Sequence, residues 1–373
     1  MIYYLLQIGK QQHYQFGKWL RNRYDSLVGK KYSKDEIYIR STDVDRTLMS
    51  ALSNLAGFFP PQSTDVWSDE LAWQPIPVHT EPEKKDGVLA SKKTCPVYDH
   101  ELKKLYKSKE FKDYDKQNKE LYKYLTKHAG KKVDSLQSVQ NIYSCLHIEQ
   151  IYNKTLPEWT KSVYPDKLLP ISGLSFATKT YTPLLARLKT GPLLKEILVR
   201  MHNKTSSVLE PNRSVWIYSA HDTTVSALLN TMGIFKTIGY HNPPYASSVL
   251  IELRKYNDGP RVQVFYRNTT GEPDPLEIPG CGTSCPLENM FKIYNDVLPV
   301  NWEEECSLSL LQMPLIENVS ETVSPITIFT FMALMMFVGI VVLLIATFHK
   351  RRDYVGVEQG NYYQSGQWND GYN

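Results

Sequence analysis

The chain has 373 residues, of which 42% are hydrophobic and 22% are charged, so wholesale disorder and collagen-like repeats are excluded. The 43 Lys and Arg against 39 Asp and Glu give a net charge of +4, which is too small to predict nucleic acid as a partner. Five Cys are too few for a disulfide-dense scaffold.

The first quarter of the chain alternates between helical and extended patterns. Apolar residues at helical spacing predict helices at residues 11–24 and 44–59. Between them, residues 36–40 read as a short strand, because two isoleucines alternate with other side chains. Residues 62–100 are Pro-rich and are expected to be irregular.

The remaining elements follow a similar order, with one long helical insertion. They are helices at residues 101–132, 133–150 and 174–203, a strand at 215–219, a helix at 222–232, and strands at 247–253 and 262–267. This order predicts an α/β fold with a mostly parallel sheet flanked by helices and an α-helical cap insertion. The core would comprise residues 1–75 and 180–310, and the cap residues 76–179.

Residues 326–348 predict a transmembrane helix. The segment holds 23 residues without a charge, and at 1.5 Å per residue it reaches about 34 Å, enough to cross a bilayer. A buried core helix of this length would normally show a polar stripe. The basic residues 349–352 predict a cytosolic tail at 349–373, so residues 1–325, including a stalk at 311–325, would be luminal or extracellular.

Glycosylation sequons agree with this single-pass type I topology. All of them precede the predicted span, at Asn153, Asn203, Asn212, Asn268 and Asn318. The first six residues are apolar but lack a basic region and a cleavage site. We therefore expect either a missing N-terminal piece or a span that acts as a late signal-anchor.

Arg40 and Arg46 flank the first of two candidate anion-binding junctions. We expect Arg40 to end the strand and to face the N-terminus of the next helix, where free N–H groups and the helix dipole favour anions. Arg46, one turn into that helix, would support the same pocket. The alternative is a structural ion pair between Arg40 and Asp43 or Asp45.

His221 and Asp222 form the second junction, at the carboxyl end of the strand at 215–219, where open α/β sheets place their ligands. An imidazole can bind an oxyanion, and a carboxylic acid can protonate a leaving oxygen. Alternatively, both residues are satisfied structural groups. The sequence shows no phosphate-binding loop, dinucleotide fingerprint or metal-ligand set, so we expect no cofactor and no metal.

The two junctions, Ile39–Ala51 and Tyr218–Leu228, resemble those of the histidine acid phosphatases of the membrane-anchored lysosomal, prostatic and testicular type. The likeness covers residue 5 to about 306. It continues through Phe59–Pro61, Gln74–His79, Pro244–Ser247, Tyr266–Asn268 and Pro279–Leu287.

The resemblance implies a phosphoglycerate-mutase-like fold and hydrolysis of small phosphate monoesters at acidic pH through a phosphohistidine. It implies that Arg40 clamps the phosphate, with Arg46 as support. It also implies that His221 is a phosphate ligand and that Asp222 is the general acid. A homodimer is common among such proteins.

The chain departs from this family at the nucleophile. The family carries its nucleophilic His in an Arg-His-Gly motif on the first strand, and no His of this chain has that context. We therefore expect an acid phosphatase whose present chain is impaired. The alternatives are a non-catalytic type I membrane glycoprotein and an inositol-polyphosphate phosphatase of the same fold.

The resemblance also implies the cysteine pairing. Cys95 should pair with Cys306, and Cys281 with Cys285. Cys145 matches a family half-cystine whose partner position holds Ser248 here, so we expect a free, buried thiol; the alternative is an intermolecular bridge. In the tail, Tyr354-Val-Gly-Val357 fits a sorting motif, which leaves lysosome and plasma membrane open as locations.

Overall fold

The computed structural model describes residues 6–268 and 271–307, in which helices surround two small sheets. The helices are α1 (Gln7–Arg23), α2 (Asp45–Phe58), α3 (Pro96–Tyr106), α4 (Lys109–Gln117), α5 (Lys119–His128), α6 (Leu136–Ile151), α7 (Leu169–Ala177), α8 (Pro183–Lys189), α9 (Gly191–Thr205), α10 (Asp222–Thr231), α11 (Leu287–Ile293) and α12 (Trp302–Cys306). The strands are β1 (Ile37–Ser41), β2 (Val215–Ser219), β3 (Ser248–Tyr256), β4 (Gly259–Arg267) and β5 (Cys285–Pro286).

Two strands that are far apart in the sequence form a parallel pair. Ile37 of β1 lies opposite Val215 of β2, and Ser41 lies opposite Ser219. Both strands therefore end at the same edge. The predicted strands at 36–40 and 215–219 are confirmed, with a shift of one residue in the first.

The second sheet is antiparallel, with the strand order β3-β4-β5. Tyr256 pairs with Gly259, so only Asn257 and Asp258 connect β3 to β4. A connection of two residues closes a hairpin, whereas a parallel pair needs a crossover of a dozen residues or more. The prediction of a mostly parallel sheet is therefore wrong for this half of the fold.

Prolines divide the helical stretch predicted at residues 174–203. The chain forms three helices there, α7, α8 and α9, and Pro183 and Pro192 lie in the first turns of the last two. Proline has no backbone N–H and tolerates the first helical turn far better than the interior. The single helical stretch was therefore wrong in extent, although its residues are largely helical.

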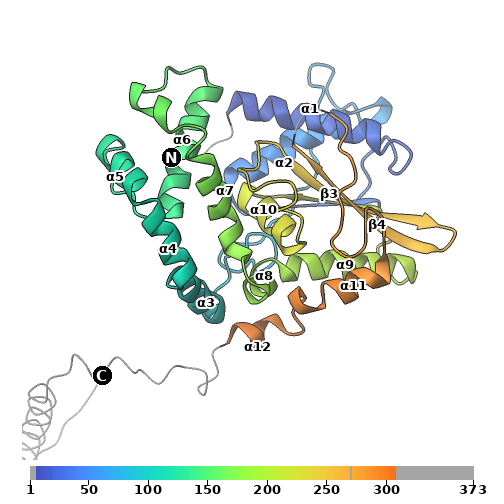
Figure 1. Cartoon of the computed structure of the whole chain (residues 1–373). Helices are drawn as coiled ribbons and strands as arrows, with labels where there is room; N and C mark the ends of the chain where they lie inside the picture. Colours follow the sequence, from blue (N-terminus) through green and yellow to red (C-terminus); the bar gives the residue numbers. More distant parts are fainter. Residues whose placement is uncertain (1–5, 269–270, 308–373) are drawn as a thin grey trace, which may run out of the picture. The chain divides into compact units, whose positions relative to one another are not determined.

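Helices α1 and α2 pack with their backbones in close contact (Figure 1). A Cβ atom added at Gly17 would lie 1.9 Å from the carbonyl oxygen of Asn54. One added at Gly57 would lie 2.1 Å from the carbonyl oxygen of Tyr14. Only glycine fits at these two positions, and their pairing fixes α2 against α1.

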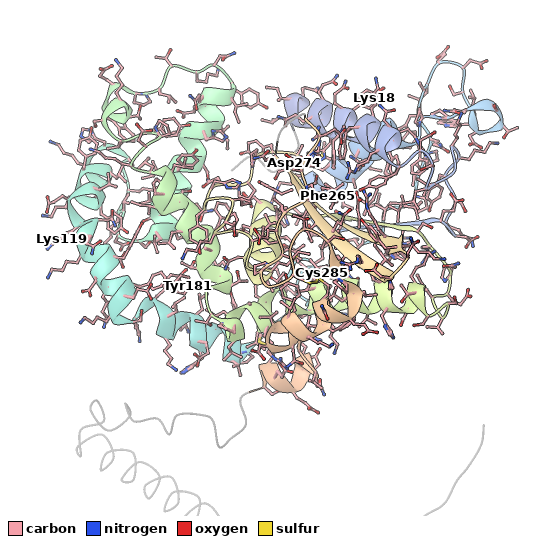
Figure 2. The ribbon with its side chains drawn as sticks, turned by 45° about the vertical axis from the view of Figure 1, so that its right-hand side comes forward. Lys18, Lys119, Tyr181, Phe265, Asp274 and Cys285 are labelled. Atoms are coloured by element: carbon pink, nitrogen blue, oxygen red, sulfur yellow. A yellow bond between two sulfur atoms is a disulfide. The ribbon has the colours of Figure 1, made fainter. Side chains whose placement is uncertain are left out.

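The helices α3 to α7 hold an apolar cluster of their own, and Figure 1 shows α3 to α6 on the side away from the β3–β4 hairpin. The cluster includes Phe111, Tyr122, Leu125, Val139, Leu146 and Leu168, each buried. Tyr181, labelled in Figure 2, donates a hydrogen bond of 2.5 Å from its hydroxyl to Glu110. The division into a core and a cap at residues 76–179 stays a prediction.

Both implied disulfides are present. Cys95 is bonded to Cys306, and Cys281 is bonded to Cys285, which Figure 2 labels. Cys145 is free, as expected, but it is exposed rather than buried. It lies outside the buried stripe of α6, whose members include Val139, Ile142, Tyr143 and Leu146.

The predicted membrane segments lie outside the described residues. These are the stalk at 311–325, the span at 326–348 and the tail at 349–373, and Asn318 belongs with them. Within the part of the chain that the structure describes, no helix is both long and apolar enough to traverse a bilayer.

Candidate active site

The carboxyl ends of β1 and β2 bring the two predicted junctions together. Just beyond the strands, the N–H of Thr42 donates to the carbonyl oxygen of Ser219 at 3.1 Å. Helix α2 begins at Asp45 and helix α10 at Asp222, so both start from the same edge. Arg46 therefore lies in the first turn of α2, opposite the start of α10.

Arg46 and His221 are in direct contact at this edge. Nη2 of Arg46 lies 3.2 Å from Nδ1 of His221. Burial, followed by the positive charges of Arg46 and Lys92, lowers the pKa of His221 from 6.5 to about 4. The imidazole is therefore neutral near pH 7, and two cationic side chains act on it.

A chain of hydroxyl groups fixes the orientation of the His221 ring. The Arg46 guanidinium can only donate, so Nδ1 of His221 accepts and Nε2 carries the proton. That N–H then donates to Oγ1 of Thr42 at 3.1 Å, and Thr42 donates to Oγ1 of Thr47 at 2.8 Å. The Thr47 hydroxyl in turn donates to the carbonyl oxygen of Val44 at 2.7 Å. These hydrogen bonds orient the ring in the absence of a ligand and favour the tautomer that is protonated at Nε2.

Asp222 stands at the start of α10 beside His221. Its Oδ1 accepts a hydrogen bond of 2.7 Å from the N–H of Thr223. Asp222 is exposed in the structure, but the protein atoms around its carboxyl group still desolvate it. This desolvation raises the pKa of Asp222, and it outweighs the hydrogen bond from Thr223 and the charge of Arg46, which both lower that pKa. A carboxyl group with a raised pKa carries a proton at acidic pH and can donate it.

Arg40 is held by carboxylates. Its Nη2 lies 2.9 Å from Oδ1 of Asp86, which is fully buried, and 3.1 Å from Oε2 of Glu81. The ion-pair alternative is thus correct in kind, but Asp43 and Asp45 are the wrong partners. The pairing of Arg40 with Asp86 could not be predicted from the sequence, because Asp86 belongs to the Pro-rich segment at residues 62–100 and reaches Arg40 only through the fold.

Several residues near the site were not singled out as functional from the sequence. Thr42 and Thr47 orient the imidazole, and Lys92 acts on it electrostatically. Tyr245 lies close enough to Asp222 for the carboxylate to raise its pKa further, after burial has raised it most. The next residue, Ala246, has a φ of 58°, which a residue other than glycine seldom adopts, so the loop that presents Tyr245 is tightly constrained.

Comparison with known proteins assigns the chain to a family. A family model described as histidine phosphatase superfamily (branch 2) matches residues 4–267. Over 308 residues the chain is 38% identical to prostatic acid phosphatase of Homo sapiens, covering 81% of this chain and 78% of that protein. Over 358 residues it is 34% identical to lysosomal acid phosphatase of Xenopus laevis, covering 94% of this chain and 79% of that protein.

A solved structure supports the fold alone. The phytase of Klebsiella sp ASR1 superposes with a TM-score of 0.61 at 17% identity, covering 83% of this chain and 88% of that one. The mixed arrangement of helices and small sheets agrees with this likeness. Together with the family match across both junctions, these findings show that the chain belongs to the histidine acid phosphatases, in branch 2 of the histidine phosphatase superfamily.

Proposed function

We propose that the protein is an acid phosphatase that hydrolyses small phosphate monoesters at the Arg46–His221 edge. In this proposal Arg46 and His221 bind the phosphoryl oxygens, and Asp222 protonates the leaving group. The contact of 3.2 Å between Arg46 and His221 is the observation that carries it, because it brings a guanidinium and an imidazole to one place, where both can contact a phosphoryl group. Phosphoryl transfer depends mostly on such positioning and charge stabilisation.

The electrostatics of the site support binding of a dianion. His221 is neutral because burial and two cations disfavour its charged form. A phosphoryl dianion beside it would reverse that balance and favour the imidazolium, which donates from both ring nitrogens. A phosphoryl dianion should therefore bind together with one proton, so the affinity should rise as the pH falls from 7 toward the second pKa of the phosphate group, about 6.

Asp222 fits the role of general acid. As the bond between phosphorus and the ester oxygen breaks, the electron pair stays on that oxygen, which takes the proton from the Asp222 carboxyl. The phosphoryl group passes to a nucleophile and then to water, so that alcohol and phosphate are the products. The raised pKa of Asp222 keeps the donating form present at acidic pH.

The nucleophile is the open part of this proposal. No Arg-His-Gly sequence occurs in the 373 residues, and among the described residues no other histidine contacts Arg46 or His221 through a hydrogen bond or ion pair. We propose that the 373 residues alone turn over poorly, and that Arg46 and His221 still bind phosphate. The alternative is a non-catalytic membrane glycoprotein, which the same missing motif favours.

The same relatives also support a proposal for the cellular location of the protein. Lysosomal acid phosphatases are among them, so we propose a single-pass type I protein of the lysosome or plasma membrane, with the phosphatase unit luminal or extracellular. The sequon residues Asn153, Asn212 and Asn268 are exposed and Asn203 is half-buried, and all four are proposed to carry glycans. A homodimer remains part of the proposal.

Two measurements test the function. Calorimetric titration of inorganic phosphate into the full chain at pH 5 should show a binding event that depends on Arg46 and His221 and is absent from His221→Ala, whatever binding remains elsewhere. Hydrolysis of p-nitrophenyl phosphate at pH 5 should be slow for the 373 residues and fast for a form that also contains an upstream Arg-His-Gly strand. Wild-type protein that binds no phosphate, or an extended form that remains inactive, would refute the phosphatase proposal.

A further inference from the structure

A cationic cavity includes Lys92, whose charge also acts on His221 of the site described above. It has a volume of about 240 Å³ and opens between residues 91–95, helix α3 and the end of helix α8. Lys92, Lys93 and Lys189 line it, together with one carboxylate, Asp99. Because a water molecule occupies about 30 Å³ in the liquid, the cavity has room for a polyatomic anion.

The buried carboxylate of Asp86 holds the segment that carries Lys92 and Lys93. Its side chain accepts hydrogen bonds from the N–H groups of Val88, Leu89 and Ala90 at 2.8–3.0 Å. Its backbone carbonyl accepts a bond of 2.9 Å from the N–H of Lys92. The positions of the lysines are therefore built into the fold, on the same Asp86 that binds Arg40.

Lys189 is tied to this segment in both directions. Its Nζ donates to the carbonyl oxygen of Ser91 at 2.7 Å, and the hydroxyl of Ser91 donates to the carbonyl oxygen of Lys189 at 2.8 Å. Ser91 has a φ of 48°, an uncommon conformation for a residue other than glycine. The ammonium also lies 5.3 Å from the ring centroid of Tyr98, on the wall of the cavity.

Positive charge exceeds negative charge around the cavity. Lys93 pairs with Glu303, which neutralises it. Within residues 6–268 and 271–307, neither Lys92 nor Lys189 forms an ion pair, which leaves two ammonium groups against the carboxylate of Asp99. Burial, then the charges of Lys92 and Lys179, lower the pKa of Lys189 to about 8, in spite of Asp99. An anion in the cavity would stabilise the charged form of Lys189 and so raise its pKa again.

We propose that this cavity is a second anion site that binds a phosphate group through Lys92 and Lys189. The site does not depend on turnover at Arg46 and His221. It is linked to them, however, because the charge of Lys92 acts on both Lys189 and His221. The phosphate group is either free phosphate or the second phosphate of a bisphosphorylated substrate, which reaches the cavity from the Arg46–His221 edge.

Titration of inorganic phosphate into full-length protein carrying His221→Ala tests the site without interference from the first one. One binding event should remain at pH 6. Lys189→Met should weaken it about tenfold, because a hydrogen bond to an ion is lost, and Lys92→Met a few-fold, because that lysine is exposed. Absence of any residual binding in the His221→Ala protein would overturn the proposal, whatever the phosphatase activity of the wild type.

Two further variants separate charge from folding. Lys119→Met removes an exposed lysine of α5, labelled in Figure 2, and should leave the residual binding unchanged. Lys189→Arg keeps the charge and should retain most of the affinity, with unchanged thermal unfolding. Equal losses in Lys119→Met and Lys189→Met would mean that only general surface charge attracts the phosphate, and the site would be rejected.

The source of the phosphate group is resolved in the wild-type background. If the group belongs to the substrate, Lys92→Met should weaken binding of fructose 1,6-bisphosphate several-fold more than that of fructose 6-phosphate. The other outcome is that Lys92→Met weakens binding of both sugar phosphates equally, while the His221→Ala protein still binds inorganic phosphate. That result identifies free phosphate as the ligand of the cavity. Both results support an anion site, whereas no effect of Lys92→Met or Lys189→Met on any of these ligands rules it out.

Discussion

The guanidinium of Arg46 and the imidazole of His221 lie 3.2 Å apart, although 175 positions separate them in the chain. They meet because β1 and β2 run in parallel and end together, and because each strand is followed by a helix that starts at that edge. The contact therefore depends on the parallel register of the two strands. Any change that shifts this register should affect phosphate binding as strongly as the loss of either side chain.

Replacement of Arg46 should reduce phosphate affinity without unfolding the protein. Its guanidinium contacts His221 and makes no ion pair among the described residues. Arg46→Met should weaken phosphate binding about 10- to 100-fold, because a charge-assisted contact to the anion is lost. Calorimetry at pH 5 measures the loss, and Arg46→Lys should recover part of it. Unchanged affinity in Arg46→Met would remove this residue from the site.

Replacement of Arg40 is the matched control for Arg46, because it should reduce stability and leave phosphate affinity nearly unchanged. Its loss leaves the buried carboxylate of Asp86 without its cationic partner, although three backbone N–H groups still solvate it. Arg40→Met should lower the free energy of unfolding by about 1–3 kcal/mol. Phosphate affinity, measured well below the melting temperature, should change little. A stable Arg40→Met protein that no longer binds phosphate would return Arg40 to the role that the sequence suggested.

Two histidines should make the fold sensitive to acid. Burial lowers the pKa of both His221 and His13 from 6.5 to about 4. As the pH falls through 6.5, the unfolded chain binds protons that the folded protein does not, so stability decreases until about pH 4. Urea unfolding at pH 7 and pH 5 should show this decrease, and His221→Asn should reduce it.

Added phosphate should oppose the same acid sensitivity. The bound anion favours the charged imidazole of His221, so phosphate should stabilise the protein more at pH 5 than at pH 7. The control is His100→Gln, which removes an exposed histidine and should leave the stabilisation by phosphate unchanged. An identical pH slope in wild type and His221→Asn would argue against a buried, neutral His221.

The close contact between α1 and α2 predicts that a single added methyl group strongly lowers the free energy of unfolding. Gly57→Ala would place a Cβ atom 2.1 Å from a backbone oxygen of α1, so the helices must separate. We expect a loss of about 1–3 kcal/mol in the free energy of unfolding. At Gly87 the nearest atom to an added Cβ is 3.5 Å away on a side chain, so Gly87→Ala should cost far less. Similar melting temperatures for the two variants would contradict this packing.

Local patterns in the sequence were sufficient for several elements. The strand β1 follows from two alternating isoleucines, β2 follows from an apolar run typical of a buried strand, and the helix α10 was expected directly after it. The antiparallel direction of β3 and β4 was not predicted, because strand direction depends on the length of the connection. Asn257 and Asp258 leave too few residues for a crossover, and the alternation of apolar residues contains no such information.

The site was predicted in position but not in detail. His221 and Asp222 lie where the strand-to-helix pattern placed them. The contacts of Arg40 with Asp86 and of Arg46 with His221 had no signal in the local sequence, and the roles of the two arginines in phosphate binding stay predictions. Such long-range pairing has no local signature in the chain. The exposure of Cys145 was missed for a similar reason, because the buried stripe of α6 depends on what packs against it.

Loss of the Asp222 carboxyl should affect poor leaving groups most. In a form extended at its N-terminus by an Arg-His-Gly strand and shown to hydrolyse phosphate esters, Asp222→Asn removes a carboxyl whose pKa desolvation raises, and leaves Arg46 and His221 in place. Hydrolysis of glycerol phosphate should fall roughly 10²- to 10³-fold, because an alkoxide needs a proton to depart. Hydrolysis of p-nitrophenyl phosphate should fall far less, since its leaving group is already stable as an anion. The ratio of kcat values for the two substrates measures the difference, and equal losses for both would show that Asp222 serves binding or folding rather than proton donation.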